Sequence, residues 1–303
     1  MQTMPLPASA KNATNTTNAS YRSVFRAGLL AGQAYIVTGG GSGIGRCTAH
    51  ELVSLGARVA LVGRRVEKLD AVRAELELAG GTASCHACDI RDEELVAGTV
   101  AQILAVHGRI DGLVNNAGGQ YPSPLAEIKA KGFDAVVRNN LTGGFVFARE
   151  CYTQWMRANG GSIVNMIADM WMGMPGMGHS GAARAGMLNL TETCALEWAP
   201  VRVNAIAPGF IASSGMDQYP PEMATLIRKM PELVPLARMG NEAEVSAAIV
   251  FLLSPAASFI SGACLRIDGA APNAKRVWPQ VGNGGSTPPF DGFALATTPK
   301  VLG

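Results

Sequence analysis

The sequence has few charged residues and no run of them. Lys, Arg, Asp and Glu make up 16% of the 303 residues, and the formal net charge is only +2. Because no dense stretch of Lys or Arg is present, nucleic acid is not an expected partner. The sequence also lacks a run of about 18 apolar residues, so no membrane-spanning helix is expected. Its start lacks the pattern of a secretory signal, and we expect a cytoplasmic protein.

The six cysteines do not form the pattern of a disulfide framework. Each lies within or beside an apolar segment, which favours buried thiols in a reducing cytoplasm. The segment from Cys85 to Cys88 includes a histidine but has no second cysteine pair to complete a zinc site. We therefore expect no metal.

Strand and helix patterns alternate between two irregular ends. Residues 1–24, rich in Asn, Thr and Ala, are predicted to be a disordered tail, and residues 273–303 an irregular C-terminal tail. Residues 25–272 are predicted to be one domain. Its predicted strands are 33–38, 57–62, 84–88, 111–115, 162–167, 202–206 and 263–267, and its predicted helices are 43–55, 66–78, 93–106, 133–157, 181–198 and 242–253.

This alternation predicts an α/β, three-layer Rossmann-like fold with a doubly wound, seven-stranded parallel sheet. The strands are short continuous apolar runs, as expected when helices cover both faces of a sheet. A small lid is expected at about 210–238. Ligands bind such sheets beyond the carboxyl ends of the strands, so the loops that follow strands are the expected site.

The loop after the first predicted strand is rich in glycine and opens a helix. Glycines there permit a tight turn and let backbone N–H groups approach a pyrophosphate at the positive end of the helix. The context of strand, loop and helix favours dinucleotide binding over a merely flexible turn. The expected contacts are Gly39, Gly41, Ser42, Gly43, Ile44 and Gly45.

Four further motifs follow in order: Cys88-Asp89-Ile90, Asn115-Asn116-Ala117-Gly118, Asn140 in Asn-Leu-Thr-Gly, and Pro208-Gly209-Phe210-Ile211. With the Thr-Gly-x-x-x-Gly-x-Gly spacing of the first loop, they resemble the short-chain dehydrogenase/reductase family over roughly residues 25–270. The resemblance implies an NAD(P)-dependent oxidoreductase. It also implies cofactor contacts by Asp89, Ile90, Asn116, Ala117, Gly118, Pro208, Gly209 and Ile211.

The end of the second predicted strand indicates which dinucleotide is bound. An acidic residue there would bind the ribose 2′-hydroxyl and repel a 2′-phosphate. This chain has Arg64 and Arg65 after Gly63 instead. Guanidinium groups suit a phosphate, although they could also be a solvated helix start. We therefore expect NADP(H) rather than NAD(H).

The residues at the family's catalytic positions differ from the usual ones. The family pattern has a serine after the fifth strand and then Tyr-x-x-x-Lys, in which the tyrosine moves a proton to or from the substrate oxygen. Here the serine position falls near Ala168, Ser180 occupies the tyrosine position and Arg184 the lysine position. Only Asn140 of the usual four is retained.

This loss favours some reactions over others. A positioned acid or base contributes about 10²- to 10⁴-fold in rate, and alcohol oxidation depends on it heavily. Reduction of an activated double bond depends on it less, because hydrogen-bond donors can hold the enolate oxygen. The start of the helix, His179-Ser180-Gly181-Ala182-Ala183-Arg184, resembles the peroxisomal trans-2-enoyl-CoA reductase branch and bacterial citronellol/citronellal dehydrogenases.

Three hypotheses follow. The first is NADPH-dependent reduction of a trans-2-enoyl-CoA or a similar conjugated thioester. The second is NAD(P)-dependent dehydrogenation of a terpenoid alcohol such as citronellol. The third is a nucleotide-binding protein without turnover. The resemblance also implies a homo-oligomer, a dimer or tetramer, by analogy with related folds.

Several side chains are predicted to do the chemistry. Arg184 is expected to hold the nicotinamide ribose or an enolate oxygen, unless it is a helix surface charge. His179 could donate or accept a proton, or face away from the site. Ser180 could bind a carbonyl or only cap its helix, and Asp169 could replace the missing serine or lie in a turn. A soft wall suited to an acyl or terpenoid chain is expected from Met166, Met170, Trp171, Met172, Met174 and Met177.

Overall fold

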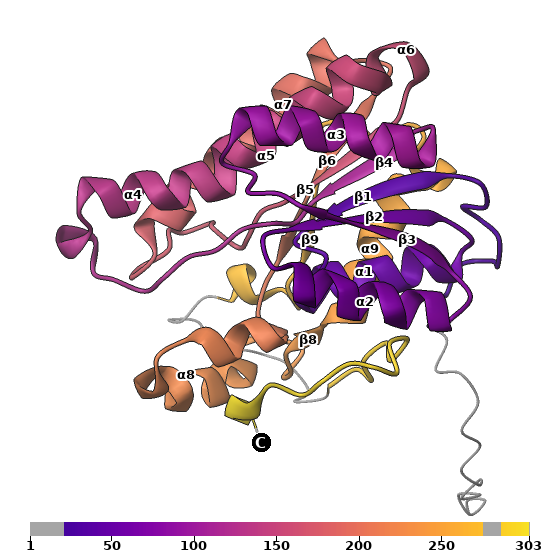
Figure 1. Cartoon of the computed structure of the whole chain (residues 1–303). Helices are drawn as coiled ribbons and strands as arrows, with labels where there is room; N and C mark the ends of the chain where they lie inside the picture. Colours follow the sequence, from indigo (N-terminus) through magenta and orange to yellow (C-terminus); the bar gives the residue numbers. More distant parts are fainter. Residues whose placement is uncertain (1–20, 275–285, 303) are drawn as a thin grey trace, which may run out of the picture.

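The computed structural model describes residues 21–274 and 286–302 and has a parallel sheet at its centre (Figure 1). Seven strands lie in the order β3-β2-β1-β4-β5-β6-β9, and every neighbouring pair is parallel. This arrangement confirms the predicted fold. The strands are β1 (Ala34–Thr38), β2 (Arg58–Gly63), β3 (Thr82–Ala87), β4 (Gly112–Asn115), β5 (Ser162–Met166), β6 (Arg202–Pro208) and β9 (Cys264–Ile267).

Helices cover both faces of the sheet, as Figure 1 shows. One face carries α1 (Gly43–Ser54), α2 (Val66–Leu78) and α9 (Glu242–Leu253), and the other carries α3 (Glu93–His107), α5 (Gly143–Cys151) and α7 (Gly178–Glu197). Every residue of β1, β4 and β5 is buried, which explains why their sequences are continuous apolar runs. Among the described residues, no helix is both long and apolar enough to cross a membrane.

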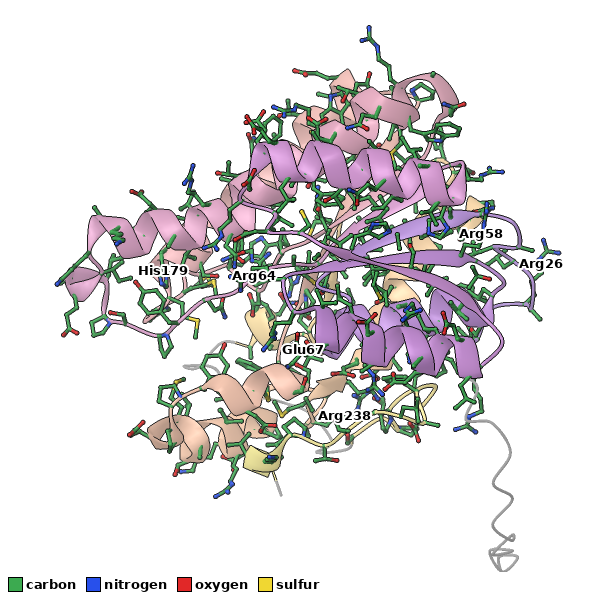
Figure 2. All side chains as sticks on the ribbon, in the orientation of Figure 1. Arg26, Arg58, Arg64, Glu67, His179 and Arg238 are labelled. Carbon is green, nitrogen blue, oxygen red and sulfur yellow. The ribbon has the colours of Figure 1, made fainter. Side chains whose placement is uncertain are left out.

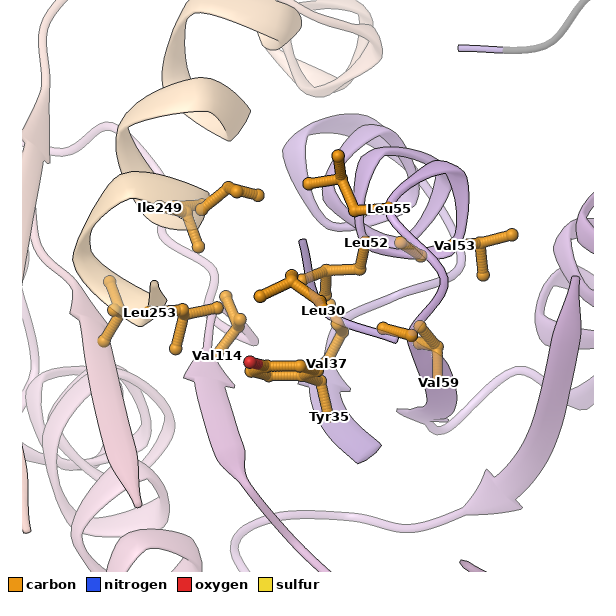
Figure 3. Close-up of a cluster of buried hydrophobic side chains, with 14 of the residues drawn as sticks. Leu30, Tyr35, Val37, Leu52, Val53, Leu55, Val59, Val114, Ile249 and Leu253 are labelled. Atoms are coloured by element: carbon orange, nitrogen blue, oxygen red, sulfur yellow. The ribbon is translucent and has the colours of Figure 1, made fainter. Parts of the chain in front are cut away.

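The largest core cluster joins α1 and α9 to the middle of the sheet (Figure 3). Leu52 of α1, Ile249 of α9 and Val37 of β1 are all fully buried there. This packing fixes the start of α1 directly beyond the carboxyl end of β1. The glycine-rich loop between them is therefore held between two rigid elements.

Two helices begin earlier than the sequence predicts. The helix expected at 133–157 starts with α4 (Ala130–Val137) and runs to the end of α6 (Arg157–Asn159), with π-helical turns at Arg138–Thr142 and Tyr152–Met156. The helix expected from 181 starts at Gly178, although glycine and serine there are weak helix formers. Its first turn is closed by N–H groups of Ser180 and Gly181, which donate to the Met177 carbonyl at 2.9 and 3.0 Å.

The 210–238 segment, predicted to be a lid, consists of short elements outside the main sheet. A two-stranded parallel ladder joins β7 (Ile211–Ala212) to β8 (Gly240–Asn241) at its two ends. Between them lie α8 (Ala224–Lys229) and the 3₁₀ turns Ser214–Gln218, Pro221–Met223 and Met230–Leu233. In Figure 1 this segment lies next to the C-terminal residues.

The two ends of the described chain pack together on α1. Tyr21 is only 6% exposed, and its hydroxyl donates to Glu51 at 3.1 Å, so the ordered body begins before the predicted tail boundary at 24. Residues 1–20 and 275–285 lie outside the described residues. Residue 303 also lies outside them, and residues 286–302 are irregular except for a 3₁₀ turn at Lys300–Leu302. Phe293 is buried against Tyr21, with its ring 5.0 Å from that of His50.

This packing predicts that the C-terminal residues stabilise the domain. We expect Phe293→Ala to lower the free energy of unfolding by about 3 kcal/mol, the cost of removing a buried aromatic side chain. Urea unfolding measures the change. Phe259→Ala is the matched control, because Phe259 is fully exposed and should change stability by less than about 0.5 kcal/mol. Equal unfolding midpoints for the two variants would contradict the prediction.

Candidate active site

The glycine-rich loop makes a turn that requires glycine at several positions. Gly39 and Gly43 have φ values of +68° and +59°, which favour glycine. A Cβ atom on Gly45 would lie 2.4 Å from the carbonyl oxygen of Gly39 and 2.6 Å from the side-chain nitrogen of Asn116. Ser42, before the first turn of α1, makes no side-chain cap bond to the helix N–H groups. The loop therefore fits a pyrophosphate at the helix N-terminus.

Thr38 clamps this loop to the next one. Its hydroxyl accepts hydrogen bonds from the backbone N–H groups of Asn116 and Ala117 at 3.0 and 2.9 Å. The Asn116 side chain in turn donates to the Thr38 carbonyl at 2.9 Å. The loops after β1 and β4 are therefore fixed as one unit, with Gly118 at its edge.

The Cys88-Asp89-Ile90 segment, expected to contact the cofactor, is held by a local ion pair between Asp89 and Arg91. The carboxylate of Asp89 accepts two bonds from Nε of Arg91, at 2.8 and 3.1 Å. These bonds lower the pKa of Asp89 to about 2. Ile90 is buried against Gly143 of α5. Asp89 is thus an oriented carboxylate at neutral pH.

Arg64 and Arg65 follow β2 and are exposed. Figure 2 shows Arg64 and Glu67 near the start of α2, far from Arg26. Among the described residues, no carboxylate lies within ion-pairing distance of either arginine. Their guanidinium groups are therefore available to a ligand.

A large cavity of about 2400 Å³ opens beyond the carboxyl ends of β4, β5 and β6. Residues of the 210–238 segment form one of its walls. Much of the lining is soft and apolar, and five of the six predicted wall residues belong to it, while Met170 packs in a neighbouring core cluster. The lining includes Ile44, Asn116, Gly118, Gln120, Tyr121, Met166, Asp169, Trp171, Met172, Met174, Met177, Arg184, Pro208, Gly209, Ile211, Tyr219 and Met223.

Arg184 is directed inward from α7. Its Nη1 donates to the Met166 carbonyl at 2.6 Å, and its Nε is buried without a partner among the described residues. A Cβ atom added to Gly118 would lie 2.8 Å from its Nη2. Burial lowers the pKa of Arg184 to about 10, so the group remains a cation at neutral pH. The alternative of a helix surface charge is therefore wrong.

Asp169 brings a carboxyl group into the same cavity. Its backbone N–H donates to the Pro208 carbonyl at 3.3 Å, while its Oδ1 is buried without a partner in the described part of the chain. Burial, helped by the nearby charge of Asp268, raises the pKa of Asp169. Asp268 itself is paired with Arg266 at 2.6 Å. The Asp169 carboxyl group thus retains a proton more readily than an exposed carboxyl group does.

Both polar groups of the Asn140 side chain are hydrogen-bonded within the protein. Its Oδ1 accepts from the Gly119 N–H at 3.0 Å, and its Nδ2 donates to the Gly119 carbonyl at 2.7 Å. It lies in a π-helical turn, Arg138–Thr142. Asn140 therefore fixes the loop that carries Gly118 and Gln120 rather than offering a free amide.

His179 and Ser180 lie inside the first turn of α7. His179 is 0% exposed, its Nδ1 accepts from the Ser180 N–H at 3.0 Å, and its Nε2 is buried without a described partner. Its ring meets that of Tyr121 edge-on, with centroids 4.7 Å apart. The Ser180 hydroxyl donates to Oε1 of Gln120 at 2.5 Å, so Ser180 is not a helix cap.

Comparison with known proteins identifies the family of this chain. The family model described as enoyl-(acyl carrier protein) reductase matches residues 39–270. The match begins directly after β1 and includes the glycine-rich loop and all the lining residues named above. The chain is a short-chain dehydrogenase/reductase. It is accordingly an NAD(P)-dependent oxidoreductase.

Relatives within the short-chain dehydrogenases/reductases include a reductase of an unsaturated acyl-CoA, of the 2,4-dienoyl type rather than the expected 2-enoyl type, and a dehydrogenase of citronellol catabolism. The probable 2,4-dienoyl-CoA reductase of Bacillus subtilis is 35% identical over 78% of this chain and 95% of its own. The structure of a citronellol catabolism dehydrogenase from Pseudomonas aeruginosa is 60% identical, with a TM-score of 0.76, over 83% of this chain and 100% of its own. An NAD⁺-bound xylitol dehydrogenase is 32% identical, with a TM-score of 0.74, over 79% and 99%.

Three residues of the site were not predicted from the sequence: Thr38, Gln120 and Tyr219. Thr38 clamps the cofactor loop, and its place directly before Gly39 was the available signal. Gln120 and Tyr219 meet in the cavity, where Nε2 of Gln120 donates to the Tyr219 hydroxyl at 3.1 Å. They are 99 residues apart, and no spacing pattern joins them.

Proposed function

We propose that this protein reduces a conjugated acyl thioester, such as a trans-2-enoyl-CoA, with NADPH. The observation that carries the proposal is the Asp169 carboxyl group, whose pKa is raised by burial and which lines a largely apolar cavity together with the Arg184 cation. Ser180, at the family's tyrosine position, has its hydroxyl proton committed to Gln120. The site thus offers an acid and a cation in place of the usual tyrosine and lysine.

The chemistry follows from these groups. A bound nicotinamide dinucleotide supplies the hydride for Cβ of the substrate. The electron pair of the double bond then moves to the thioester oxygen, and the resulting enolate is stabilised by the buried guanidinium of Arg184. Asp169 gives its proton to Cα as the carbonyl re-forms, and solvent reprotonates the carboxylate. Arg184 therefore stabilises the enolate oxygen, and Asp169 supplies the proton.

We infer that NADP(H) is preferred over NAD(H), because two exposed arginines follow β2 where an acidic residue would bind a ribose 2′-hydroxyl. Replacing both, Arg64→Ala with Arg65→Ala, should raise the Kd of NADPH about 10- to 100-fold, the loss of charged hydrogen bonds to a phosphate. The Kd of NADH should stay within about 2-fold, because NADH lacks the 2′-phosphate. That change is smaller than the contribution of one hydrogen bond. Fluorescence titration measures both. Arg26→Ala, at the far end of the sheet (Figure 2), is the control. Equal losses for NADPH and NADH would contradict the preference.

A second function is supported by a different observation. Among the described residues that line the cavity, the buried Arg184 is the one cation. Few other lining groups could bind the phosphates of a CoA carrier. Together with the 60% identity to the citronellol catabolism dehydrogenase, this favours dehydrogenation of a terpenoid alcohol. In that reaction the carboxylate form of Asp169 would accept the hydroxyl proton.

A turnover panel separates these functions. NADPH oxidation is followed with medium- and long-chain 2-enoyl-CoAs, and reduction of NADP⁺ and NAD⁺ with citronellol. The proposal expects turnover of the thioesters; turnover of citronellol alone would overturn it. Tight NADPH binding without turnover of either would favour a protein that only binds the nucleotide.

Two further expectations have their own tests. Light scattering of the same sample tests the expected homo-oligomer, and fractionation of the source cells tests the expected cytoplasmic location.

A further inference from the structure

A hydrogen-bonded chain of two hydroxyl groups and one amide links α7 to the 210–238 segment at the edge of the cavity. Ser180 donates to Oε1 of Gln120, and Nε2 of the same amide donates to the Tyr219 hydroxyl at 3.1 Å. Gln120 lies one residue after Gly119, which Asn140 holds from both sides. The amide that joins the two hydroxyls is therefore attached to a fixed loop.

The two hydroxyls differ in what they can offer a ligand. A hydroxyl group has a single proton to donate. Ser180 is completely buried and gives its proton to Gln120. Tyr219 only accepts in this network, and it lines the cavity directly. Its O–H therefore remains available to an oxygen in the cavity, while Ser180 has none to give.

The backbone holds Tyr219 at this place. Its N–H donates to the Met216 carbonyl at 3.3 Å at the end of the 3₁₀ turn Ser214–Gln218. Two residues earlier, Oδ1 of Asp217 accepts from the N–H of Val301 at 3.2 Å, so the C-terminal residues are tied to the same turn. The phenol is thus carried by a wall of the cavity that is anchored to the body.

We infer that Tyr219 donates a hydrogen bond to the oxygen of the substrate carbonyl, with Gln120 as the residue that orients it. This inference rests on the proposed function, since it assigns a second donor, besides Arg184, to the enolate oxygen. The donor is neutral and cannot replace Asp169 as the proton source for Cα. It forms no covalent bond, and its proton stays on the phenol.

Two nearly isosteric variants test the role. Tyr219→Phe removes the hydroxyl. Gln120→Glu keeps the shape but turns the bridging amide into a carboxylate, which has no proton to give, so Tyr219 must donate to it instead. Both should lower kcat for trans-2-decenoyl-CoA reduction by about 10²-fold, as the loss of an oxyanion donor does, with KM within about 3-fold. The Kd of NADPH should not change. Tyr152→Phe, whose ring is stacked on Trp198, is the control and should match the unmodified protein.

A kcat within 2-fold of the unmodified protein for either variant would overturn the inference. If Gln120→Glu alone is slow, an added charge is the cause and Tyr219 is not a donor. The proposed function fails separately, when the unmodified protein does not reduce the thioester. In that case the same variants are measured with citronellal and NADPH, where the inference still requires Tyr219 to bind the carbonyl oxygen and both variants to be slow.

Discussion

Asp169→Asn lowers kcat for enoyl thioester reduction by about 10²- to 10⁴-fold, the usual contribution of a positioned acid. An amide fills the same space but cannot give up a proton at neutral pH. The Kd of NADPH should stay within about 2-fold, because Asp169 lies after β5, away from the glycine-rich loop. Steady-state kinetics and fluorescence titration measure the two quantities. Asp70→Asn, an exposed carboxylate of α2 in an ion pair with Arg73, is the matched control.

The same carboxyl group sets the expected pH dependence. Because burial raises the pKa of Asp169, the protonated form that can donate persists above the usual range of a carboxyl group. Thioester reduction should therefore be fastest below this raised pKa and slow down as the pH rises through it. Asp169→Asn should remove that limb from the pH profile of kcat. An unchanged profile in the variant would show that another group supplies the proton.

Gly45→Ala raises the Kd of NADPH about 5- to 150-fold, the equivalent of the 1–3 kcal/mol that overpacking costs. Its new methyl group would lie 2.4 Å from the Gly39 carbonyl oxygen, and that contact is with backbone, so the loop itself must move. A moved loop no longer presents its N–H groups to a pyrophosphate.

The control for this variant is Gly98→Ala in α3. Gly98 has a helical backbone, and a Cβ atom there meets nothing within 4 Å. It should therefore leave NADPH binding unchanged and stabilise the domain by about 0.5–1 kcal/mol. If Gly45→Ala binds NADPH as tightly as Gly98→Ala does, the loop does not hold the pyrophosphate.

The fold could be predicted because its signals are local and repeated. Strand runs such as Ala34–Thr38 are apolar throughout, since helices cover both faces of the sheet, and each is followed by a helical period. The glycine-rich loop was identifiable for the same reason, because its spacing is fixed by the turn between β1 and α1. Residues 21–24 were placed wrongly in a tail, because the burial of Tyr21 depends on Phe293, far along the chain.

The chemistry was less predictable, because it depends on contacts between distant segments. His179 and Ser180 lie in a helix that begins with weak helix formers, so their burial came from packing and not from propensity. Asn140 had the right position by sequence, but only the structure reveals that both ends of its amide are bound to Gly119. Tyr219 reaches Gln120 across 99 residues, and no local rule predicts that meeting.

Isotope transfer tests the central claim most directly. The protein is incubated with trans-2-decenoyl-CoA and NADPH that carries deuterium at C4 of the nicotinamide, in separate samples for the two faces of the ring. Mass spectrometry then locates the label. We expect a saturated acyl-CoA with one deuterium at Cβ from one of the two samples and a solvent proton at Cα. Unreacted thioester in both samples, together with reduction of NADP⁺ by citronellol, would contradict the account.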